Sequence, residues 1–252
     1  MLAEERRLKL AEWTKSDGRL DATVAALKLD VAVETVRRDL DVLQRRGVVR
    51  RVHGGAISPE KFAHEFTIPE RQSRNPERKR SVAAVAANFI PEEGAIYVDG
   101  GTTTQFLAEH LRDRPRLVVV TNSVILASKL ADSSTQTHML GGRIRPASLS
   151  TVGAKTVSEL AEINAVACFI GANGVSIDGG ISTYDTDEAL VKKTIMRNSV
   201  EKILLIDSGK FGSVYPARFA EFGSFDRIVT NFDADQGYLD SFIAAGVEVA
   251  LA

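Results

Sequence analysis

The sequence predicts an α/β protein with a small N-terminal winged helix-turn-helix domain followed by a larger C-terminal α/β domain. One observation is a helix-and-hairpin pattern, rich in arginine, that ends near residue 57. A second is the alternation of apolar runs with amphipathic ones from residue 95 to the end of the chain. The 252 residues are also enough to bury two ordinary hydrophobic cores. We therefore expect domains at 1–57 and 76–252, joined by a linker at 58–75.

Composition and charge narrow the class of protein. Hydrophobic residues make up 44% and charged residues 26%, which is typical of a folded globular chain. No apolar stretch reaches the ~18 residues that a membrane span needs, and the N-terminus has no signal-peptide core. The single cysteine, Cys168, cannot form an internal disulfide, which fits a reducing compartment. We expect a cytoplasmic protein without a membrane partner.

The charge is unevenly distributed, although the net charge is only −1. Residues 1–57 carry three more basic than acidic side chains, whereas residues 81–252 carry six more acidic than basic ones. An excess of positive charge at one end of a chain favours a polyanionic partner there.

The first two helices of the N-terminal domain are expected at 3–15 and 22–29, with Asp21 as a cap of the second. After a turn at 30–32, a third helix is indicated by apolar residues spaced three and four apart. These residues are Val33, Val36, Leu40 and Leu43.

Gly47 is well placed to end this third helix, and the β-forming residues that follow it predict a two-stranded hairpin. In a winged helix-turn-helix domain, such a helix enters the major groove of DNA and the hairpin lies along the backbone.

Seven side chains of this helix and hairpin are candidates for DNA contact. Arginines on a helix surface are often only solvated, so their position matters more than their number. Residues in the first turns of the helix can reach base edges, and residues of the hairpin can reach phosphates. The candidates nearest to bases are Thr35 and Arg37, and those nearer to phosphates are Arg38, Arg45, Arg50, Arg51 and His53.

The same stretch resembles a known family. The string TVRRDLDVLQRRGVVRRVHGGA, from Thr35 to Ala56, is similar to the signature of the DeoR family of bacterial transcriptional regulators. The match includes the T-(I/V)-R-R-D-L core and the R-x-H-G-G-A wing of that family. It implies a regulator that binds operator DNA.

Two positions depart from the family pattern: Ala32 stands where the family usually has Ser, and Val24-Ala25 where it has Glu-Leu. A Ser would cap the third helix, and Asp30 could supply the cap if the helix begins earlier.

Residues 58–80 contain three prolines and no sustained apolar period. We expect these residues to form a linker with at most a short helix, and we expect the arginines of the linker to be mostly solvated. Arg71, Lys79 and Arg80 are weaker candidates for ligand contact. A helix is then expected from about Pro76 to Ile90.

The rest of the chain alternates strand and helix patterns, which predicts a largely parallel sheet covered on both faces. The strand candidates are AIYV, LVVV, THML, AVACFI, KILLI, DRIV and VEVAL. Helical patterns lie at 103–111, 123–131, 185–198 and 235–244. Sheets of this kind bind ligands in the crevice beyond the carboxyl ends of their strands.

Five of these strand ends are followed by polar turns. Gly, Thr, Asn and Ser are ordinary turn residues, but backbone amides and hydroxyls in such turns also suit an anion such as phosphate. Together they predict a pocket for a small phosphorylated polyol or sugar, with Arg143 and Lys210 as cations. The candidates are Asp99, Gly100, Gly101, Thr102, Thr103, Thr104, Thr121, Asn122, Ser123, Gly142, Arg143, Gly171, Asn173, Asp207 and Lys210.

The resemblance to the DeoR family extends through these turns. Asp99 to Thr104 is similar to the family's D-S-G-T-T-T, with Gly100 in place of Ser. The T-N-S, G-G-x-(I/L)-R, F-(I/V)-G-A-x-G, E-A-x-V-K-K and D-S-(S/G)-K-F patterns appear at 121–123, 141–145, 169–174, 188–193 and 207–211. The resemblance implies a sensor domain that is like ribose-5-phosphate isomerase in fold and answers to phosphorylated sugars. It adds Glu188 and Lys192 to the ligand-binding candidates.

The leading hypothesis is a repressor of sugar or carbohydrate metabolism genes that binds operator DNA as a homo-oligomer, a dimer or a tetramer, and responds to a phosphorylated sugar. No cofactor and no metal are expected, since the histidines lack metal-ligand spacing. One alternative is a sugar-phosphate isomerase with Glu188, Asp99 or Asp207 as its base. Another is a DNA-binding protein whose α/β domain only oligomerises.

Overall fold

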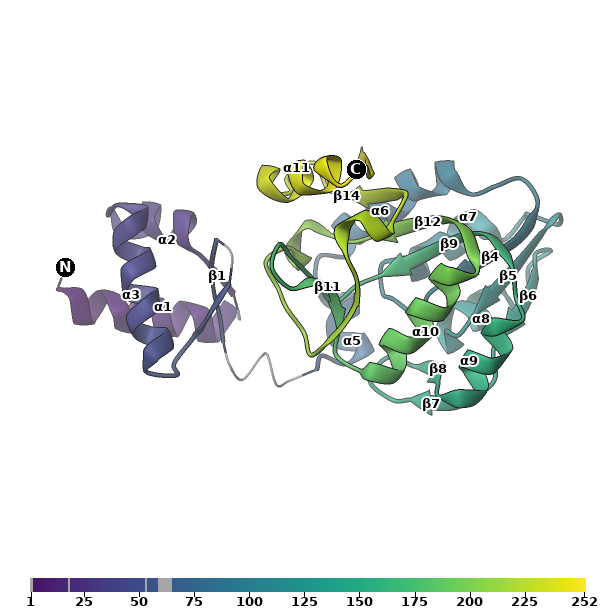
Figure 1. Cartoon of the computed structure of the whole chain (residues 1–252), viewed down its shortest axis with the longest axis horizontal. Coiled ribbons are helices and arrows are strands. Elements are labelled where there is room, and N and C mark those ends of the chain that lie inside the picture. The colour runs from purple at the N-terminus through teal and green to yellow at the C-terminus, as the bar shows by residue number, and fades with distance from the viewer. Residues whose placement is uncertain (1, 18, 53, 59–64) are drawn as a thin grey trace.

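The computed structural model describes residues 2–17, 19–52, 54–58 and 65–252. A small N-terminal domain and a larger α/β domain lie side by side along the long axis of the molecule (Figure 1). The fold class predicted from the sequence is therefore confirmed. Within the described part of the chain, no helix combines the length and the apolar character needed to cross a membrane.

The N-terminal domain contains three helices and a small antiparallel sheet of order β1-β3-β2. The helices are α1 (Ala3–Asp17), α2 (Ala22–Leu29) and α3 (Val33–Arg45). The strands are β1 (Arg19–Asp21), β2 (Arg50–Val52) and β3 (Gly55–Ile57). Leu10, Leu29, Val36 and Leu40 belong to one buried cluster that joins the three helices. The predicted three helices and hairpin are present, and β1 is an additional strand that pairs with the hairpin.

The ends of the second and third helices are built differently. Asp21 caps α2, because its carboxylate accepts hydrogen bonds from the amides of Thr23 at 2.7 Å and Val24 at 3.0 Å. Helix α3 begins after Ala32, whose side chain cannot accept such a bond. Asp30 has a left-handed backbone with φ of 51° and ends α2, so the expectation that it could cap the third helix is wrong.

The α/β domain is organised on a seven-stranded parallel sheet of order β15-β14-β12-β9-β4-β5-β6. Its strands are β4 (Gly94–Val98), β5 (Leu117–Thr121), β6 (Gln136–Met139), β9 (Ala165–Gly171), β12 (Ser199–Leu205), β14 (Arg227–Thr230) and β15 (Glu248–Leu251). All seven predicted strand segments overlap these strands, and the parallel arrangement is as predicted.

Helices cover both faces of this sheet. They are α5 (Ile68–Ser73), α6 (Pro76–Ala86), α7 (Ala108–Leu111), α8 (Val124–Leu130), α9 (Ala154–Ala161), α10 (Thr186–Arg197) and α11 (Gln236–Ala244). Short 3-10 turns are η1 (Ala87–Phe89), η2 (Thr104–Leu107), η3 (Ser208–Lys210) and η4 (Phe222–Ser224). Ile96 and Tyr97 are neighbours on β4 and belong to separate buried clusters, as expected of a strand buried on both sides.

Two small antiparallel sheets flank the carboxyl edge of the parallel sheet and were not predicted. One pairs β7 (Arg143–Arg145) with β8 (Ser150–Val152). The other has the order β10-β11-β13, with bounds Gly174–Ser176, Gly180–Thr183 and Ala217–Ala220. Both follow strands of the parallel sheet in the chain and add residues beyond its carboxyl ends.

The second half of the expected linker is attached to the α/β domain. Helix α5 begins at a capping box formed by Thr67 and Glu70. The Nη2 of Arg71 donates to the carbonyl oxygen of Ala147 at 2.9 Å, and the Nε2 of Gln72 donates to the side-chain oxygen of Gln105 at 3.1 Å. Helix α5 therefore packs on the α/β domain, directly before α6.

Candidate functional site

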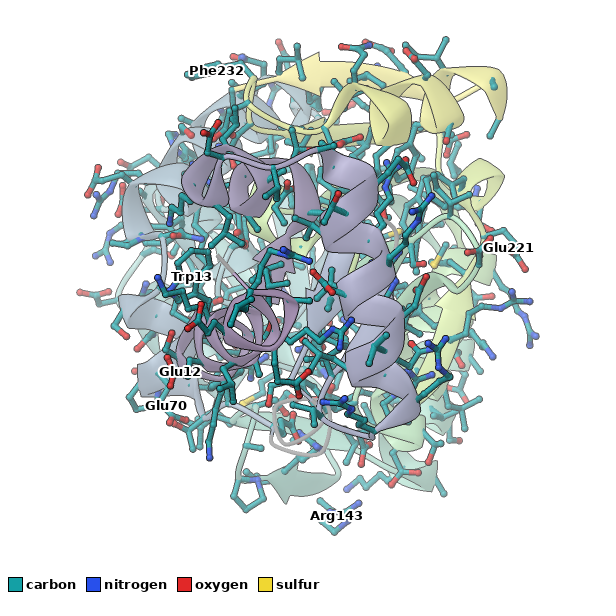
Figure 2. The ribbon with its side chains drawn as sticks, turned by 90° about the vertical axis from the view of Figure 1, so that its left-hand side faces the viewer. Glu12, Trp13, Glu70, Arg143, Glu221 and Phe232 are labelled. Atoms are coloured by element: carbon teal, nitrogen blue, oxygen red, sulfur yellow. The ribbon has the colours of Figure 1, made fainter. Side chains whose placement is uncertain are left out.

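The exposed face of α3 carries the predicted DNA-binding cations. Val36, which packs into the domain core, is fully buried, whereas Arg37, Arg38 and Arg45 are exposed and Thr35 is half-buried. Figure 2 looks onto this domain, with α3 on the side of the molecule that faces the viewer. The apolar spacing of the sequence thus places the arginines where an approaching duplex could meet them.

The acidic residue inside the R-R-D-L core turns inward instead. Asp39 is 2% exposed. Its carboxylate accepts hydrogen bonds from Nε of Arg6 at 2.5 Å and Nε of Arg7 at 2.8 Å. These bonds attach α3 to α1. Sequence reasoning missed this role, although Asp39 follows Val36 by three positions and so falls on the buried face of the helix.

The candidate cations differ in whether they already form ion pairs within the protein. Arg37 pairs with Glu34 at 2.5 Å on the helix surface. Arg51 is held by Asp41 at 2.9 Å and donates to the carbonyl oxygen of Gly55 at 3.0 Å. Among the described residues, neither Arg38 nor Arg45 has an ion pair, so both are available to phosphates. DNA contact by these residues stays a prediction.

Two further DNA-binding candidates complete the set. Arg50 lies on β2, is exposed and has interactions within the chain. His53 lies outside the residues that the structure describes.

A polar hollow lies beyond the carboxyl ends of β4, β5 and β9, at the edge where the sequence places the ligand site. Predicted residues that line it are Asp99, Gly100, Gly101, Thr102, Thr103, Asn122, Gly171, Asn173, Glu188, Lys192 and Lys210. Ser148, Ser150 and Ala172 line it as well and were not predicted, and so does Arg71, which the sequence offered only as a weaker candidate. The sheet topology therefore brings together residues that are up to 139 positions apart in the chain.

Three hydroxyl candidates do not line the hollow, because they hold its turns together. The Oγ1 of Thr104 donates to the carbonyl oxygen of Asp99 at 2.6 Å. The Oγ1 of Thr121 donates to the carbonyl oxygen of Val98 at 2.6 Å. Ser123 caps α8 by accepting from the amide of Leu126 at 3.2 Å.

Three other candidates also lie outside the wall. Gly142 has φ of 138°, and a Cβ atom there would lie 2.1 Å from Oγ1 of Thr156, so this glycine is required by packing. Arg143 is exposed, pairs with Asp187 at 2.8 Å and projects from the margin of the molecule in Figure 2. Asp207 is buried behind the wall, where it accepts from Nδ2 of Asn75 at 3.3 Å.

A buried ion pair forms part of the wall. The Nζ of Lys192 bonds Oδ2 of Asp99 and donates to the carbonyl oxygen of Gly171 at 3.0 Å. The same carboxylate oxygen accepts from the amide of Gly171 at 3.1 Å. The charges of Asp99 and Lys192 therefore neutralise each other away from solvent.

The second carboxylate of the wall, Glu188, shares one guanidinium with two other carboxylates. It accepts from Oγ1 of Thr183 at 2.9 Å and pairs with Nη1 of Arg145 at 3.4 Å. Arg145 also pairs with Asp185 at 3.2 Å and with Glu65. Burial opposes the charge of Arg145, but the hydrogen bond to Glu65 and the nearby carboxylates raise its pKa above the ordinary value.

Two cations of the wall lack a described ion pair. No described carboxylate lies within ion-pair distance of Arg71 or Lys210. Burial lowers the pKa of Lys210, Asp207 opposes this effect, and the positive charges of Arg71 and Arg74 lower it further. The residues that line the hollow include three cations, Arg71, Lys192 and Lys210, and two carboxylates, Asp99 and Glu188, and this balance suits an anion.

The other weak candidates from the linker region are placed elsewhere. Lys79 is buried and donates to the carbonyl oxygens of Arg71 and Arg74, so it closes the end of α5, and burial lowers its pKa to about 8. Arg80 is exposed and pairs with Glu77 at 2.8 Å. The described part of the chain holds no group of three or more His, Cys, Asp and Glu side chains that could bind a metal ion.

These features define a helix-turn-helix protein that carries a separate α/β domain with its own hollow. Two family models agree with this division. A DeoR-like helix-turn-helix domain matches residues 6–62, and a DeoR C-terminal sensor domain matches residues 74–232. The chain belongs to the DeoR family of transcriptional regulators, as its sequence resemblance implies.

Similar proteins along nearly the whole chain bear the names of transcriptional regulators. The regulator GlpR of Haloferax volcanii is 30% identical, over 99% of this chain and 98% of that protein. The lactose phosphotransferase system repressor of Streptococcus mutans is 32% identical, over 93% and 94%. The repressor GlcR of Bacillus subtilis is 28% identical, over 99% and 96%.

Solved structures show a more distant likeness. Ribose 5-phosphate isomerase A from Neisseria gonorrhoeae aligns with 54% of this chain and 54% of its own, at 21% identity and a TM-score of 0.40. The full-length sorbitol operon regulator SorC from Klebsiella pneumoniae aligns with 91% and 97%, at 12% identity and a TM-score of 0.40. Likenesses at these scores carry no argument about function.

Proposed function

We propose that this protein represses sugar or carbohydrate metabolism genes and that a phosphorylated sugar bound in the hollow releases or modulates its hold on operator DNA. The observation that carries the proposal is the presence of Arg71 and Lys210, neither within ion-pair distance of a described carboxylate, in a hollow rich in amides and hydroxyls. The printed names of two relatives, a lactose phosphotransferase system repressor and the repressor GlcR, support the repressor role.

The hollow offers different groups to the two parts of such a ligand. The amides and hydroxyls of the Gly100–Thr103 turn, together with the two cations, suit the phosphate group. Ser148, Ser150 and Asn173 can exchange hydrogen bonds with sugar hydroxyls. Glu188 can accept from a hydroxyl with the carboxylate oxygens that Arg145 and Thr183 leave available.

On the DNA side, Thr35 and Arg37 would lie closest to bases, and Arg38, Arg45, Arg50, Arg51 and His53 closer to phosphates. A homo-oligomer, dimer or tetramer, would place two such helices on paired half-sites, which raises affinity without new kinds of contact. The ligand would act by binding one arrangement of the oligomer more tightly than the other, with a coupling of roughly 1–3 kcal/mol.

The isomerase alternative receives no support from the arrangement of the carboxylates. A catalytic base must be able to accept a proton from the substrate. Asp99 is paired with Lys192, Glu188 is paired with Arg145, and Asp207 lies behind the wall of the hollow.

Thermal unfolding of the full chain tests the proposed ligand class. The panel is inorganic phosphate, ribose 5-phosphate, glucose 6-phosphate, fructose 1-phosphate and glycerol 3-phosphate, each sugar or polyol beside its unphosphorylated parent. A ligand at ~100 times its dissociation constant adds roughly 2.7 kcal/mol to the free energy of unfolding. At least one phosphorylated compound should raise Tm where its parent does not. No shift across the panel would favour the alternative in which the α/β domain only oligomerises.

The recognition helix is tested separately by a gel-shift titration with the operator fragment. The double variant Arg37→Ala with Arg38→Ala should lose operator retention while its α/β domain unfolds as in the wild type. Unchanged retention would remove α3 from the DNA interface.

A further inference from the structure

Strand β15 forms one edge of the parallel sheet, and its outer side carries unpaired backbone groups. It lies beside β14 and, within the described residues, no strand pairs with its other side. The amides of Glu248 and Ala252 donate to carbonyl oxygens on the β14 side at 3.0 Å and 2.9 Å. The backbone groups of successive strand residues point to alternate sides, so those of Val249 and Leu251 point away from the sheet.

This edge lacks features that usually keep an open strand from pairing. Native edge strands are commonly protected by Lys or Pro residues or by a bulge. The strand has the sequence EVAL, which contains neither residue, and its register with β14 is regular. Its one charged side chain, Glu248, is held by Arg227 at 2.6 Å. An edge of this kind is a ready template for another strand.

Exposed apolar side chains lie near this edge. Leu251 is 48% exposed, Phe232 is 78% exposed, and Ile243 is 58% exposed on α11, which packs on β15. The amide of Phe232 donates to the carbonyl oxygen of Ala252 at 3.1 Å, which places Phe232 beside the end of the strand. Phe232 lies at the upper margin of the molecule in Figure 2, and α11 lies at the upper margin in Figure 1. A strand of four residues buries far less than the ~800 Å² per partner of a stable interface, so these apolar groups would complete it.

The outer side of β15 is complementary to itself when two copies meet antiparallel. With Ala250 on a two-fold axis, Val249 of one copy faces Leu251 of the other, and each such pair exchanges two backbone hydrogen bonds. Every outward amide of the strand is then satisfied. The alanine at the axis is small and neutral, and Glu248 faces Ala252 of the second copy, so no like charges lie opposite each other.

The opposite edge of the sheet, β6, is less suited to pairing with itself. The amide of Leu140 donates to β5 at 2.9 Å, so the outward amides of β6 are those of Thr137 and Met139. The two-fold position therefore falls on His138. Two exposed imidazoles would face each other there, and each already lies 2.9 Å from the side-chain nitrogen of Gln136. The comparison favours β15 as the edge that meets a second copy.

We propose that two copies of this chain pair through antiparallel β15 strands, so that their sheets join into one. The inference rests on the proposed function, in which a homo-oligomer binds paired half-sites, and it names the surface of assembly. The two-fold axis of the pair would also relate the two N-terminal domains, as the two halves of a palindromic operator require. A tetramer would use this contact together with a second one.

Disulfide cross-linking tests the register of the pair. In Ala250→Cys, the two Cα atoms would lie ~4.5 Å apart across the axis, within the range of a disulfide. In Val249→Cys, the matched control, the two copies of the residue would lie more than ~7 Å apart, which is too far. The native Cys168 is buried, and burial raises the pKa of its thiol to about 12, so it should not react. After mild oxidation, a non-reducing gel should show a cross-linked dimer for Ala250→Cys and a monomer for Val249→Cys.

Sedimentation velocity over a range of protein concentrations, with and without the operator fragment, tests the assembly itself. Leu251→Pro removes an outward amide from each copy and leaves the bonds to β14 in place, so Tm should stay within a few degrees of the wild type. Association should weaken on the order of 10- to 100-fold, because two hydrogen bonds of the symmetric pair are lost. Leu251→Ala keeps the amide and should weaken association less. Met139→Pro is the matched control on the outer side of β6 and should leave association unchanged.

The outcomes separate the two levels of the proposal. If the wild type sediments as a monomer both alone and on its operator fragment, the homo-oligomer of the proposed function fails and this inference fails with it. If the wild type assembles but Leu251→Pro assembles equally well, the inference alone is overturned, because the second copy then uses another surface. Failure of Ala250→Cys to cross-link, or equal cross-linking of Val249→Cys, would overturn the proposed pairing as well.

Discussion

The two domains both present cations, but in opposite settings. On α3, Arg37, Arg38 and Arg45 are exposed to solvent. In the α/β domain, Arg71 and Lys210 line a hollow, and neither forms an ion pair with a described carboxylate. Water and salt screen the first group, so each exposed charge contributes modestly. In the hollow, each charge acts at short range in a poorly solvated place. A long polyanion can be held by many weak contacts, whereas one small anion needs a few strong ones.

This comparison predicts that single substitutions matter far more in the α/β domain. The largest effect is expected for Lys192→Met, which leaves the buried carboxylate of Asp99 without its cation. The free energy of unfolding should fall by about 3–5 kcal/mol, because an uncompensated buried charge is strongly unfavourable. Urea unfolding of the ligand-free protein, followed by far-UV circular dichroism, measures this loss.

The double variant Asp99→Asn with Lys192→Met serves as the control for that prediction. It removes both charges, so it should regain a good part of the lost stability. If the double variant is no more stable than Lys192→Met, the loss of unfolding free energy is explained by packing and not by the uncompensated charge of Asp99.

The next largest effect is expected at Arg145, whose carboxylate partners come from two distant parts of the chain: Glu65 before α5, and Asp185 and Glu188 at the start of α10. Arg145→Met should destabilise the α/β domain by roughly 2–3 kcal/mol, because the remaining carboxylates are part-buried and repel one another. Proteolysis near Glu65 should also become faster, since its ion pair is lost. Arg143→Met is the matched control, because its exposed pair with Asp187 should be worth less than 1 kcal/mol. Equal losses in the two variants would contradict the distinction.

The same contrast explains how much the sequence could predict. The recognition surface is one continuous stretch, so apolar spacing alone separates buried Val36 and Leu40 from exposed Arg37 and Arg38. The family signature covers the same residues. The inward role of Asp39 was not predicted, because its partners, Arg6 and Arg7, lie on another helix and no local sequence pattern indicates the contact.

The hollow is predictable only in part, because it is assembled by topology. The rule that parallel strands end at one edge brings Asp99, Gly171 and Lys210 together from the sequence alone. Arg71 belongs to a proline-rich stretch with no strand before it, so nothing local places it at that edge. Arg143 follows a strand as the rule requires, yet β7 carries its side chain outward.

At the exposed surface of α3, single substitutions are expected to have smaller, additive effects on operator binding. Arg38→Ala and Arg45→Ala should each weaken operator binding and reduce the slope of log K against log salt concentration by about 1. Neither change should alter the free energy of unfolding by more than about 0.5 kcal/mol, because both side chains are exposed and unpaired among the described residues. Fluorescence anisotropy with an operator fragment at several salt concentrations measures the slope. Arg116→Ala, at an exposed pair in the α/β domain, should leave the slope unchanged.

The smallest expected effect is a gain in stability at the start of α3. Ala32 is the N-terminal cap of this helix and cannot accept a hydrogen bond, which leaves its first amides without a side-chain partner. Ala32→Ser should stabilise the N-terminal domain by about 1 kcal/mol, because a serine cap accepts from an amide one turn into the helix. Hydrogen exchange of the α3 amides would detect the gain, and Ala32→Val should give none. If serine also fails to slow exchange, then the start of α3 is already held by contacts other than a cap. In that case the exposed recognition surface would depend on tertiary packing, as the hollow does, and the contrast between the two regions would be confined to their charges.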